Sequence, residues 1–238
     1  MHRYKKILEA AMTVFILAGS FYIGKYSAVM VESTQIIDKK SILQNKTIVI
    51  DCGHGGFDSG KVGINEALEK DVNLAIGEKL CSLLEENGNQ VIMTRQDDMG
   101  LYDEEEENKK QQDMKRRVQM INESEADLAV SIHQNSYTEE YVNGPQVFFY
   151  ETSVKAKELA NILQQNLNMK LQIERPREIK GNTTYYLLCK TQIPTVIVEC
   201  GFLSNEKEAE KLVDPEYQQQ IAEAICCGIE EYVSVEEE

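Results

Sequence analysis

Residues 47–56 read TIVIDCGHGG. The run TIVID is mostly β-branched and apolar, which is typical of a strand buried in a sheet. Three glycines surround His54 directly after this run, and glycine lets the backbone turn sharply. We therefore predict that a central strand ends here and that the following loop exposes the imidazole of His54.

The rest of the domain alternates short apolar runs with stretches of helical spacing. Further strands are predicted at 90–94, 128–132, 147–150 and 195–199. Helices are predicted from 71 to a cap at Gly88, over 113–123 and 153–167, and after Ser204 and Pro215. This alternation favours an α/β fold with a mainly parallel sheet flanked by helices.

Size and charge limit the classes of function. A chain of 238 residues with 42% hydrophobic residues can bury one substantial core. Its formal net charge is -15 and its pI is near 4.8. Proteins that bind nucleic acid need clustered Lys and Arg to neutralise phosphates. We expect a single domain and no nucleic-acid partner.

The N-terminus differs from the rest of the chain. Basic residues, among them Arg3 and Lys6, precede an apolar run over 7–23. This order is typical of a signal or anchor that takes the chain out of the cytoplasm. We assign 1–26 to this segment, 27–46 to a polar linker and 47–235 to the folded domain. The run has about the length of a short membrane span and no clear cleavage site follows, which favours an uncleaved membrane anchor over a cleaved signal or a buried helix.

Two histidines of the domain point to a metal site. His54 and His133 each follow the carboxyl end of a predicted strand, and this edge of a parallel sheet is where ligand sites gather. Zinc enzymes commonly use two imidazoles and one carboxylate. Glu69, just before the helix predicted near 71, can supply the carboxylate, and Glu66 is the competing candidate. We predict one zinc ion held by His54, Glu69 and His133.

A further carboxylate, Glu199, follows the four apolar residues of the strand TVIV. Burying an unpaired ion is costly, so a carboxylate at this position needs a nearby cation. Hydrolysis at a metal also needs a group that accepts a proton from water and returns it to the leaving nitrogen. We predict Glu199 to be this acid and base, with the rest of the metal site beside it.

The cysteines do not form a recognisable framework. Six are scattered along the chain without the spacing of a disulfide scaffold or a CxxC zinc site. Most are expected to be small buried residues. Cys52 and Cys200 lie next to the predicted chemistry in sequence, which leaves a redox bridge or metal ligation open for these two.

Five blocks of sequence together resemble a known family. They are IVIDCGHGGFDSG at 48–60, EKDVNL at 69–74, TR at 94–95, SIHQN at 131–135 and VECGFLSN at 198–205. In this order they resemble the zinc-dependent N-acetylmuramoyl-L-alanine amidases of type 3, over about 47–232. Cys52 and Cys200 depart from the residues usual in the family, which bears on redox sensitivity rather than on the ligand set.

The resemblance implies a six-stranded sheet, zinc on His54, Glu69 and His133, and Glu199 as catalytic acid/base. It implies hydrolysis of the lactyl amide bond between N-acetylmuramic acid and L-alanine in peptidoglycan. The anchor, the VECGFLSN block and the helix DMKRRVQMIN are similar to the germination-specific amidases of spore formers, which act on spore cortex so that muramic-δ-lactam can form. This implies a location in the forespore or cortex compartment.

Other hypotheses remain open from the sequence. A zinc peptidase that cleaves inside the stem peptide could use the same ligands. A non-catalytic zinc protein that binds the wall or a partner is the alternative from another class, although it would have no use for Glu199. An accessory protein outside the cytoplasm that supports folding or zinc retention is also compatible with three protein ligands.

Overall fold

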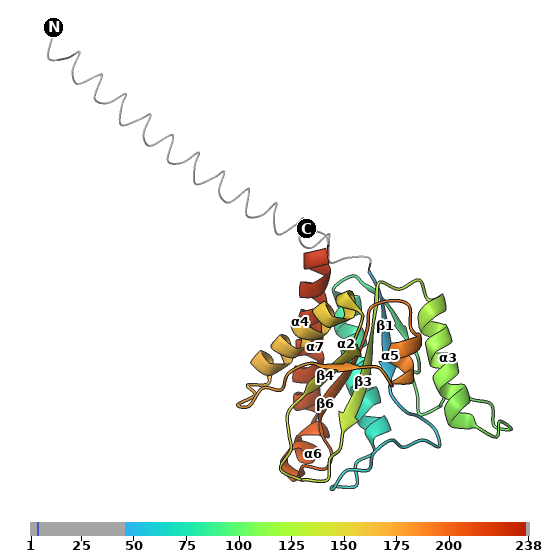
Figure 1. Ribbon diagram of the computed structural model, residues 1–238. Coiled ribbons are helices and arrows are strands. Elements are labelled where there is room, and N and C mark those ends of the chain that lie inside the picture. The colour runs from blue at the N-terminus through green and yellow to red at the C-terminus, as the bar shows by residue number, and fades with distance from the viewer. Residues whose placement is uncertain (1–3, 5–45, 237–238) are drawn as a thin grey trace. The chain divides into compact units, whose positions relative to one another are not determined.

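The computed structural model describes Tyr4 and residues 46–236 (Figure 1). The predicted signal or anchor segment, 1–26, and the linker, 27–46, lie outside the described residues apart from Tyr4 and Lys46. In the described part of the chain, none of the helices combines the length and apolar character needed to cross a membrane.

The strands form one sheet of six in the order β2-β1-β3-β6-β4-β5. Their bounds are β1 Thr47–Cys52, β2 Gln90–Met93, β3 Leu128–Asn135, β4 Gln146–Tyr150, β5 Lys180–Asn182 and β6 Thr195–Phe202. The helices are α2 Glu69–Glu86, α3 Lys109–Glu123, α4 Val154–Lys170, α5 Tyr186–Lys190, α6 Glu206–Leu212 and α7 Pro215–Glu236. The α/β class is therefore confirmed.

The sheet is mixed: it is mainly parallel, as predicted, but it contains one antiparallel pair of strands. Strands β2, β1, β3 and β6 are parallel, whereas β4 runs antiparallel to β6 and carries β5 parallel to itself. The connection from β3 to β4, residues 136–145, contains no helix. Parallel neighbours need a long crossover, usually a helix, so the short connection sends β4 back in the opposite direction.

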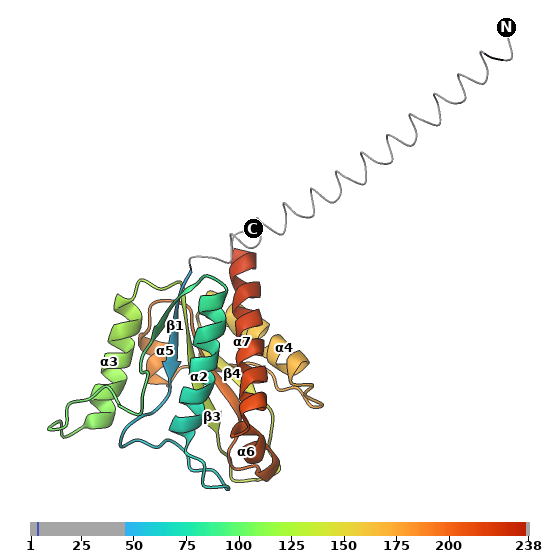
Figure 2. The same ribbon diagram turned by 180° about the vertical axis from the view of Figure 1, so that it is seen from behind.

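Helices cover both faces of the sheet. Helices α2, α4 and α7 enclose the larger core on one face, and α3 and α5 close a smaller core on the other (Figures 1 and 2). Alternate residues of β1 supply both cores, because Ile48 and Ile50 face the first and Val49 faces the second. Such buried, β-branched strands explain why the predicted strand runs were apolar on both faces.

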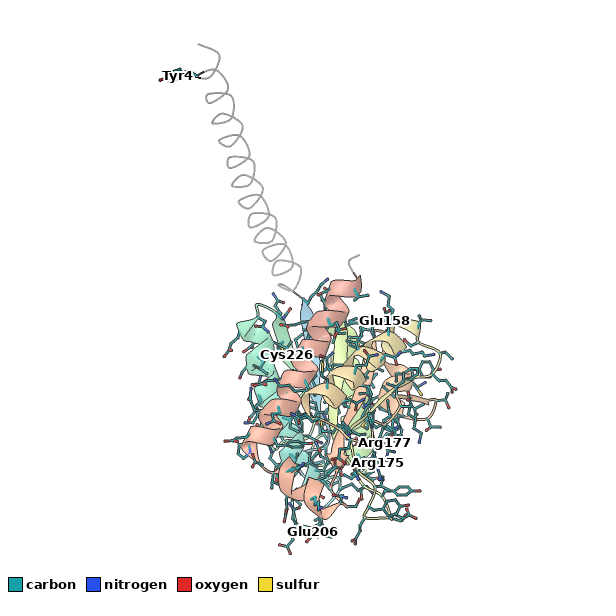
Figure 3. All side chains as sticks on the ribbon, turned by 90° about the vertical axis from the view of Figure 1, so that its left-hand side faces the viewer. Tyr4, Glu158, Arg175, Arg177, Glu206 and Cys226 are labelled. Atoms are coloured by element: carbon teal, nitrogen blue, oxygen red, sulfur yellow. The ribbon has the colours of Figure 1, made fainter. Side chains whose placement is uncertain are left out.

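The long helix α7 holds together the layer of helices that encloses the larger core. Cys226 lies on this helix (Figure 3), with its Sγ 3.6 Å from Nδ2 of Asn87, the residue that ends α2. Ile221, Ile225 and Ile229 of α7 are fully or almost fully buried in the same core. The apolar contacts of α7 thus fix α2, whose first residue contributes to the site described next.

Candidate metal centre

The carboxyl ends of three neighbouring strands bring the predicted site residues together. His54 lies two residues beyond β1, and His133 lies within β3. Glu199 of β6 is the register partner of His133. Glu69 is the first residue of α2, so the predicted helix begins two residues earlier than the sequence indicated.

Glu69 links the two imidazoles. Its Oε1 lies 3.1 Å from Nε2 of His54 and 2.9 Å from Nδ1 of His133. One ligand atom from each of the three residues lies within 4.8 Å of the others. Two nitrogens and one carboxylate oxygen form a donor set that suits a divalent transition metal such as zinc. This cluster can therefore hold a metal ion.

Two glycines leave the space that these side chains need. A Cβ atom on Gly53 would lie 2.3 Å from the ring of His133. A Cβ atom on Gly60 would lie 2.5 Å from Oε2 of Glu69 and 2.7 Å from the ring of His54, and the φ angle of Gly60 is +66°. Any side chain at either position would displace a candidate ligand, so the glycines of the quoted motif shape the cluster as well as the turn.

Hydrogen bonds hold Glu69 in place. Its Oε2 accepts from the Lys61 amide at 2.8 Å, and its Oε1 accepts from the Gln134 amide at 3.1 Å. Burial alone would raise the pKa of Glu69, but the hydrogen bonds and positive charge of His133 and His54 outweigh it and lower the pKa below its usual range. The carboxylate is therefore ionised and available to a cation.

Asp58 is a second acidic partner of His54. Burial opposes the charged imidazole, yet the hydrogen bonds to Asp58 and Glu69 raise the pKa of His54 to about 9. A cation is thus favoured between these carboxylates, whether a proton or a metal ion.

The carboxylate of Glu199 lies beside the cluster, and its Oε2 lacks a compensating hydrogen bond within the described chain. This oxygen is also inaccessible to solvent. Burial raises the pKa of Glu199 to about 7, and the nearby charge of His133 only partly opposes this. An unpartnered buried oxygen beside three side chains that could hold a metal ion fits a site that takes a cation and water.

A cavity of about 340 Å³ opens over these residues. His54, His133 and Glu199 line it, together with Lys110, Tyr185 and Tyr186. Tyr185 and Tyr186 are 39% and 41% exposed. A substrate can therefore reach the cluster from solvent through the opening between α3 and α5.

Two buried arginines support the loop that carries His54. Arg117 donates to the carbonyl oxygens of Cys52 and His54 at 2.7 and 2.6 Å. Arg95 donates to those of Cys52 and Gly53 at 2.9 and 3.1 Å. Neither arginine was predicted to have a role, although Arg117 lies four residues after Asp113 and four before the buried Ile121 on one face of α3. That spacing was the available signal.

The alternatives left open by the sequence lie outside the cluster. Glu66 is exposed and does not belong to the metal-ligating group. Cys52 and Cys200 are free and buried. Burial raises the pKa of the Cys52 thiol to about 12 and also raises that of Cys200. The two thiols are thus neutral and are not part of the cluster.

Comparison with known proteins identifies the family. The family model described as N-acetylmuramoyl-L-alanine amidase matches residues 48–231. The germination-specific N-acetylmuramoyl-L-alanine amidase of Bacillus subtilis (strain 168) is 38% identical, with 80% of this chain and 81% of the relative covered.

Solved structures agree with the sequence comparison. The CwlD amidase from Clostridioides difficile, solved in complex with the GerS lipoprotein, has a TM-score of 0.78 and 43% identity, covering 80% of this chain and 100% of that one. An N-acetylmuramoyl-L-alanine amidase from Clostridium difficile 630 has a TM-score of 0.72 and 31% identity, covering 80% and 98%. The resemblance found in the sequence is confirmed: this chain belongs to the N-acetylmuramoyl-L-alanine amidase family.

Proposed function

We propose that this amidase releases stem peptides from muramic acid in spore-cortex peptidoglycan, for muramic-δ-lactam formation and germination, with one zinc ion held by His54, Glu69 and His133. The observation that carries the proposal is the convergence of these three side chains beside the unpartnered Oε2 of Glu199. The germination-specific relative from Bacillus subtilis supports the choice of cortex as substrate.

The chain's own residues divide the chemistry between them. A zinc ion, when bound, supplies positive charge that acidifies water and polarises a carbonyl. Glu199 accepts a proton from the attacking water and returns it to the nitrogen of L-alanine as that group departs. A C–O bond forms at the lactyl carbonyl and its C–N bond breaks, which yields a lactyl carboxylate and a free peptide amine.

Glu199 is suited to both halves of this proton transfer. A group with a pKa near the working pH can both accept and donate a proton, and burial raises the pKa of Glu199 to about 7. The register pairing of Glu199 with His133 keeps the carboxylate beside the proposed ligands.

Digestion of purified cortex peptidoglycan tests the proposal. We expect masses of intact stem peptides that begin with L-alanine, and we expect a chelator to abolish their release and added zinc to restore it. Fragments cut inside the stem would instead identify a zinc peptidase. Tight binding of peptidoglycan with no released peptide would identify a non-catalytic binding protein.

The family and the sequence of the N-terminal segment both support a proposed place of action outside the cytoplasm. A relative from Staphylococcus aureus that is named a probable cell wall amidase supports an extracytoplasmic location. We propose residues 1–26 as a signal or membrane anchor, 27–46 as a linker and 47–235 as the zinc amidase domain. Fractionation of cells that produce the full chain tests the anchor, because a cleaved signal would release the domain from membranes.

An accessory protein is a further part of the proposal. The CwlD structure contains the GerS lipoprotein, which supports an extracytoplasmic partner for this chain as well. Zinc analysis of the purified full chain tests the need for one. Stoichiometric zinc in the protein alone would show that no partner is required to retain the metal.

A further inference from the structure

Asp58 makes a contact with the metal-facing histidine that the proposed function leaves unused. Its Oδ2 lies 3.0 Å from Nδ1 of His54, on the side of the ring opposite to Nε2, which faces Glu69 at 3.1 Å. A carboxylate can only accept from the imidazole, so Nδ1 carries the hydrogen. The lone pair of a neutral His54 ring is then on Nε2, directed into the cluster.

His54 depends on this contact more than a histidine within a strand would. It has a φ angle of 64° and lies between Gly53 and Gly55, so the residues on either side provide no side chain against its ring. The side chain is 18% exposed. Its hydrogen bonds to Asp58 and Glu69 therefore restrain the orientation of the ring, together with an edge contact to the ring of His133.

The two proposed histidine ligands are held in different ways. His133 lies within β3 and packs its ring on Gly53. Among the described residues no carboxylate other than that of Glu69 is within ion-pair distance of His133, whereas His54 contacts both Glu69 and Asp58. Both rings contact Glu69, but strand geometry and packing add to the restraint on His133, whereas the hydrogen bond to Asp58 adds to the restraint on His54.

Asp58 is itself fixed from several directions. Its Oδ1 accepts from the Gly60 amide at 3.2 Å, and Nζ of Lys110 on α3 lies 3.1 Å from its Oδ2. Its backbone forms two hydrogen bonds with Gly55, at 3.0 and 3.2 Å. A carboxylate with this many restraints has a defined position from which it can orient the imidazole.

We propose that Asp58 is a positioning residue for the metal site, which fixes the tautomer and orientation of His54 and is held in place across the cavity by Lys110. This inference rests on the proposed function, because it concerns the zinc ligand His54. Outer carboxylates of this kind typically contribute about 10–100-fold to metal affinity.

Zinc affinity of the full-length protein tests the proposal, measured by competition with a chromophoric chelator. We expect Asp58→Ala to weaken zinc binding by about 10–100-fold. In Asp58→Asn the amide oxygen can still accept from Nδ1, so we expect a smaller loss. Lys110→Met removes only the support of Asp58, and we expect its loss to be smaller than that of Asp58→Ala.

Asp98→Asn is the matched control. Asp98 is also paired with a lysine near this loop, Lys70 at 2.8 Å, but it does not contact His54. We expect its zinc affinity to equal that of the wild type. Melting of the metal-free variants separates positioning from folding, because a positioning role lowers zinc affinity even where the melting temperature is unchanged.

The outcomes are distinct. Zinc affinity of Asp58→Ala within twofold of the wild type would overturn the proposal, as would an equal loss in Asp98→Asn. If Asp58→Ala does not fold, the comparison of Asp58→Asn with Asp98→Asn decides in the same way. Absence of zinc binding by the wild type, both alone and with an accessory protein, would overturn the metal assignment itself, whereas the ratio of variant to wild type reports on Asp58 alone.

Discussion

Asp51 of β1 and Glu199 of β6 are acidic residues on the two strands that flank β3, and their surroundings differ. Asp51 accepts from Arg117 at 2.7 Å, Thr94 at 2.8 Å and Ser131 at 2.5 Å. Burial would raise its pKa, but Arg117 and the hydrogen bonds outweigh burial and lower the pKa to about 2. Glu199 has no such partner for its Oε2 in the described chain, and burial raises its pKa to about 7.

This difference separates structural from chemical use of a buried carboxylate. The charge of Asp51 is compensated within the fold, so its proton affinity is low and it holds Arg117 under the His54 loop. The charge of Glu199 is left to be compensated by what enters the cavity. Substitutions and pH changes can therefore test whether Asp51 serves stability and Glu199 serves the reaction.

The largest effect is expected for Glu199→Gln. Removal of a general acid and base typically lowers the rate by about 10²–10⁴-fold. Glutamine keeps the size of the side chain, so we expect peptide release to fall by this factor while zinc content is unchanged. Release of stem peptides from cortex fragments, followed by mass spectrometry, measures the rate, and metal analysis measures the zinc.

Glu208→Gln provides a matched comparison at the same end of β6. Glu208 is a buried carboxylate that accepts from the amides of Gly144 and Phe202, at 2.9 and 2.8 Å. We expect its substitution to lower the melting temperature but to leave the rate of the folded enzyme largely unchanged. Rapid turnover by Glu199→Gln, or an equal loss of rate in both variants, would contradict the role assigned to Glu199.

Arg117→Met is expected to have the next largest effect. It leaves Asp51 and Asp113 without their shared cation, and breaking a buried pair on one side typically costs about 3–5 kcal/mol of unfolding free energy. Urea unfolding measures the loss. Arg116→Met is the control, because Arg116 pairs with the exposed Asp103 and should change stability little. An equally small loss of unfolding free energy in both variants would show that the Asp51 network does not stabilise the fold.

Much of the fold was predictable because β1, β3 and β6 are buried, β-branched runs. Strand β5 was missed because Lys180–Asn182 is only three residues long and has no apolar pattern. The direction of β4 was also missed, since an apolar run does not encode direction. Residues 136–145 did carry a signal, because a connection without helical spacing favours an antiparallel return.

The candidate site residues that follow or end a predicted strand could be predicted from the sequence. His54, His133 and Glu199 follow or end apolar runs, so their positions were visible in the sequence. The supporting residues depend on contacts between distant segments, such as Arg117 with Asp51, 66 residues apart in the sequence. In the helix sequence KKQQDMKRRVQMINE several basic residues look equivalent, and only the direction of each on α3 separates the buried Arg117 from its neighbours.

The stability of the protein should depend on pH through Glu199. Its pKa rises from 4.5 to about 7 on folding, so the folded, metal-free protein binds an extra proton between these values. Stability is therefore favoured at low pH and lost as pH rises through 7. The loss relative to Glu199→Gln should be about 3 kcal/mol between pH 4 and 8. Urea unfolding with chelator present measures it, and parallel pH profiles of the two proteins would contradict the assignment.

Asp51 should show the opposite sign and the smallest effect. Its pKa falls from 3.8 to about 2 on folding, so the unfolded chain binds more protons in this range. The stabilisation is complete above about pH 4 and should be lost as pH falls through 2, by about 2 kcal/mol. The double variant Asp51→Asn/Arg117→Met lacks the group and its partner, so its unfolding free energy should change less over this range. Equal acid sensitivity of the wild type and the double variant would mean that the charge of Asp51 does not stabilise the fold. Asp51 and Glu199 would then differ in their position but not in the use of their charge.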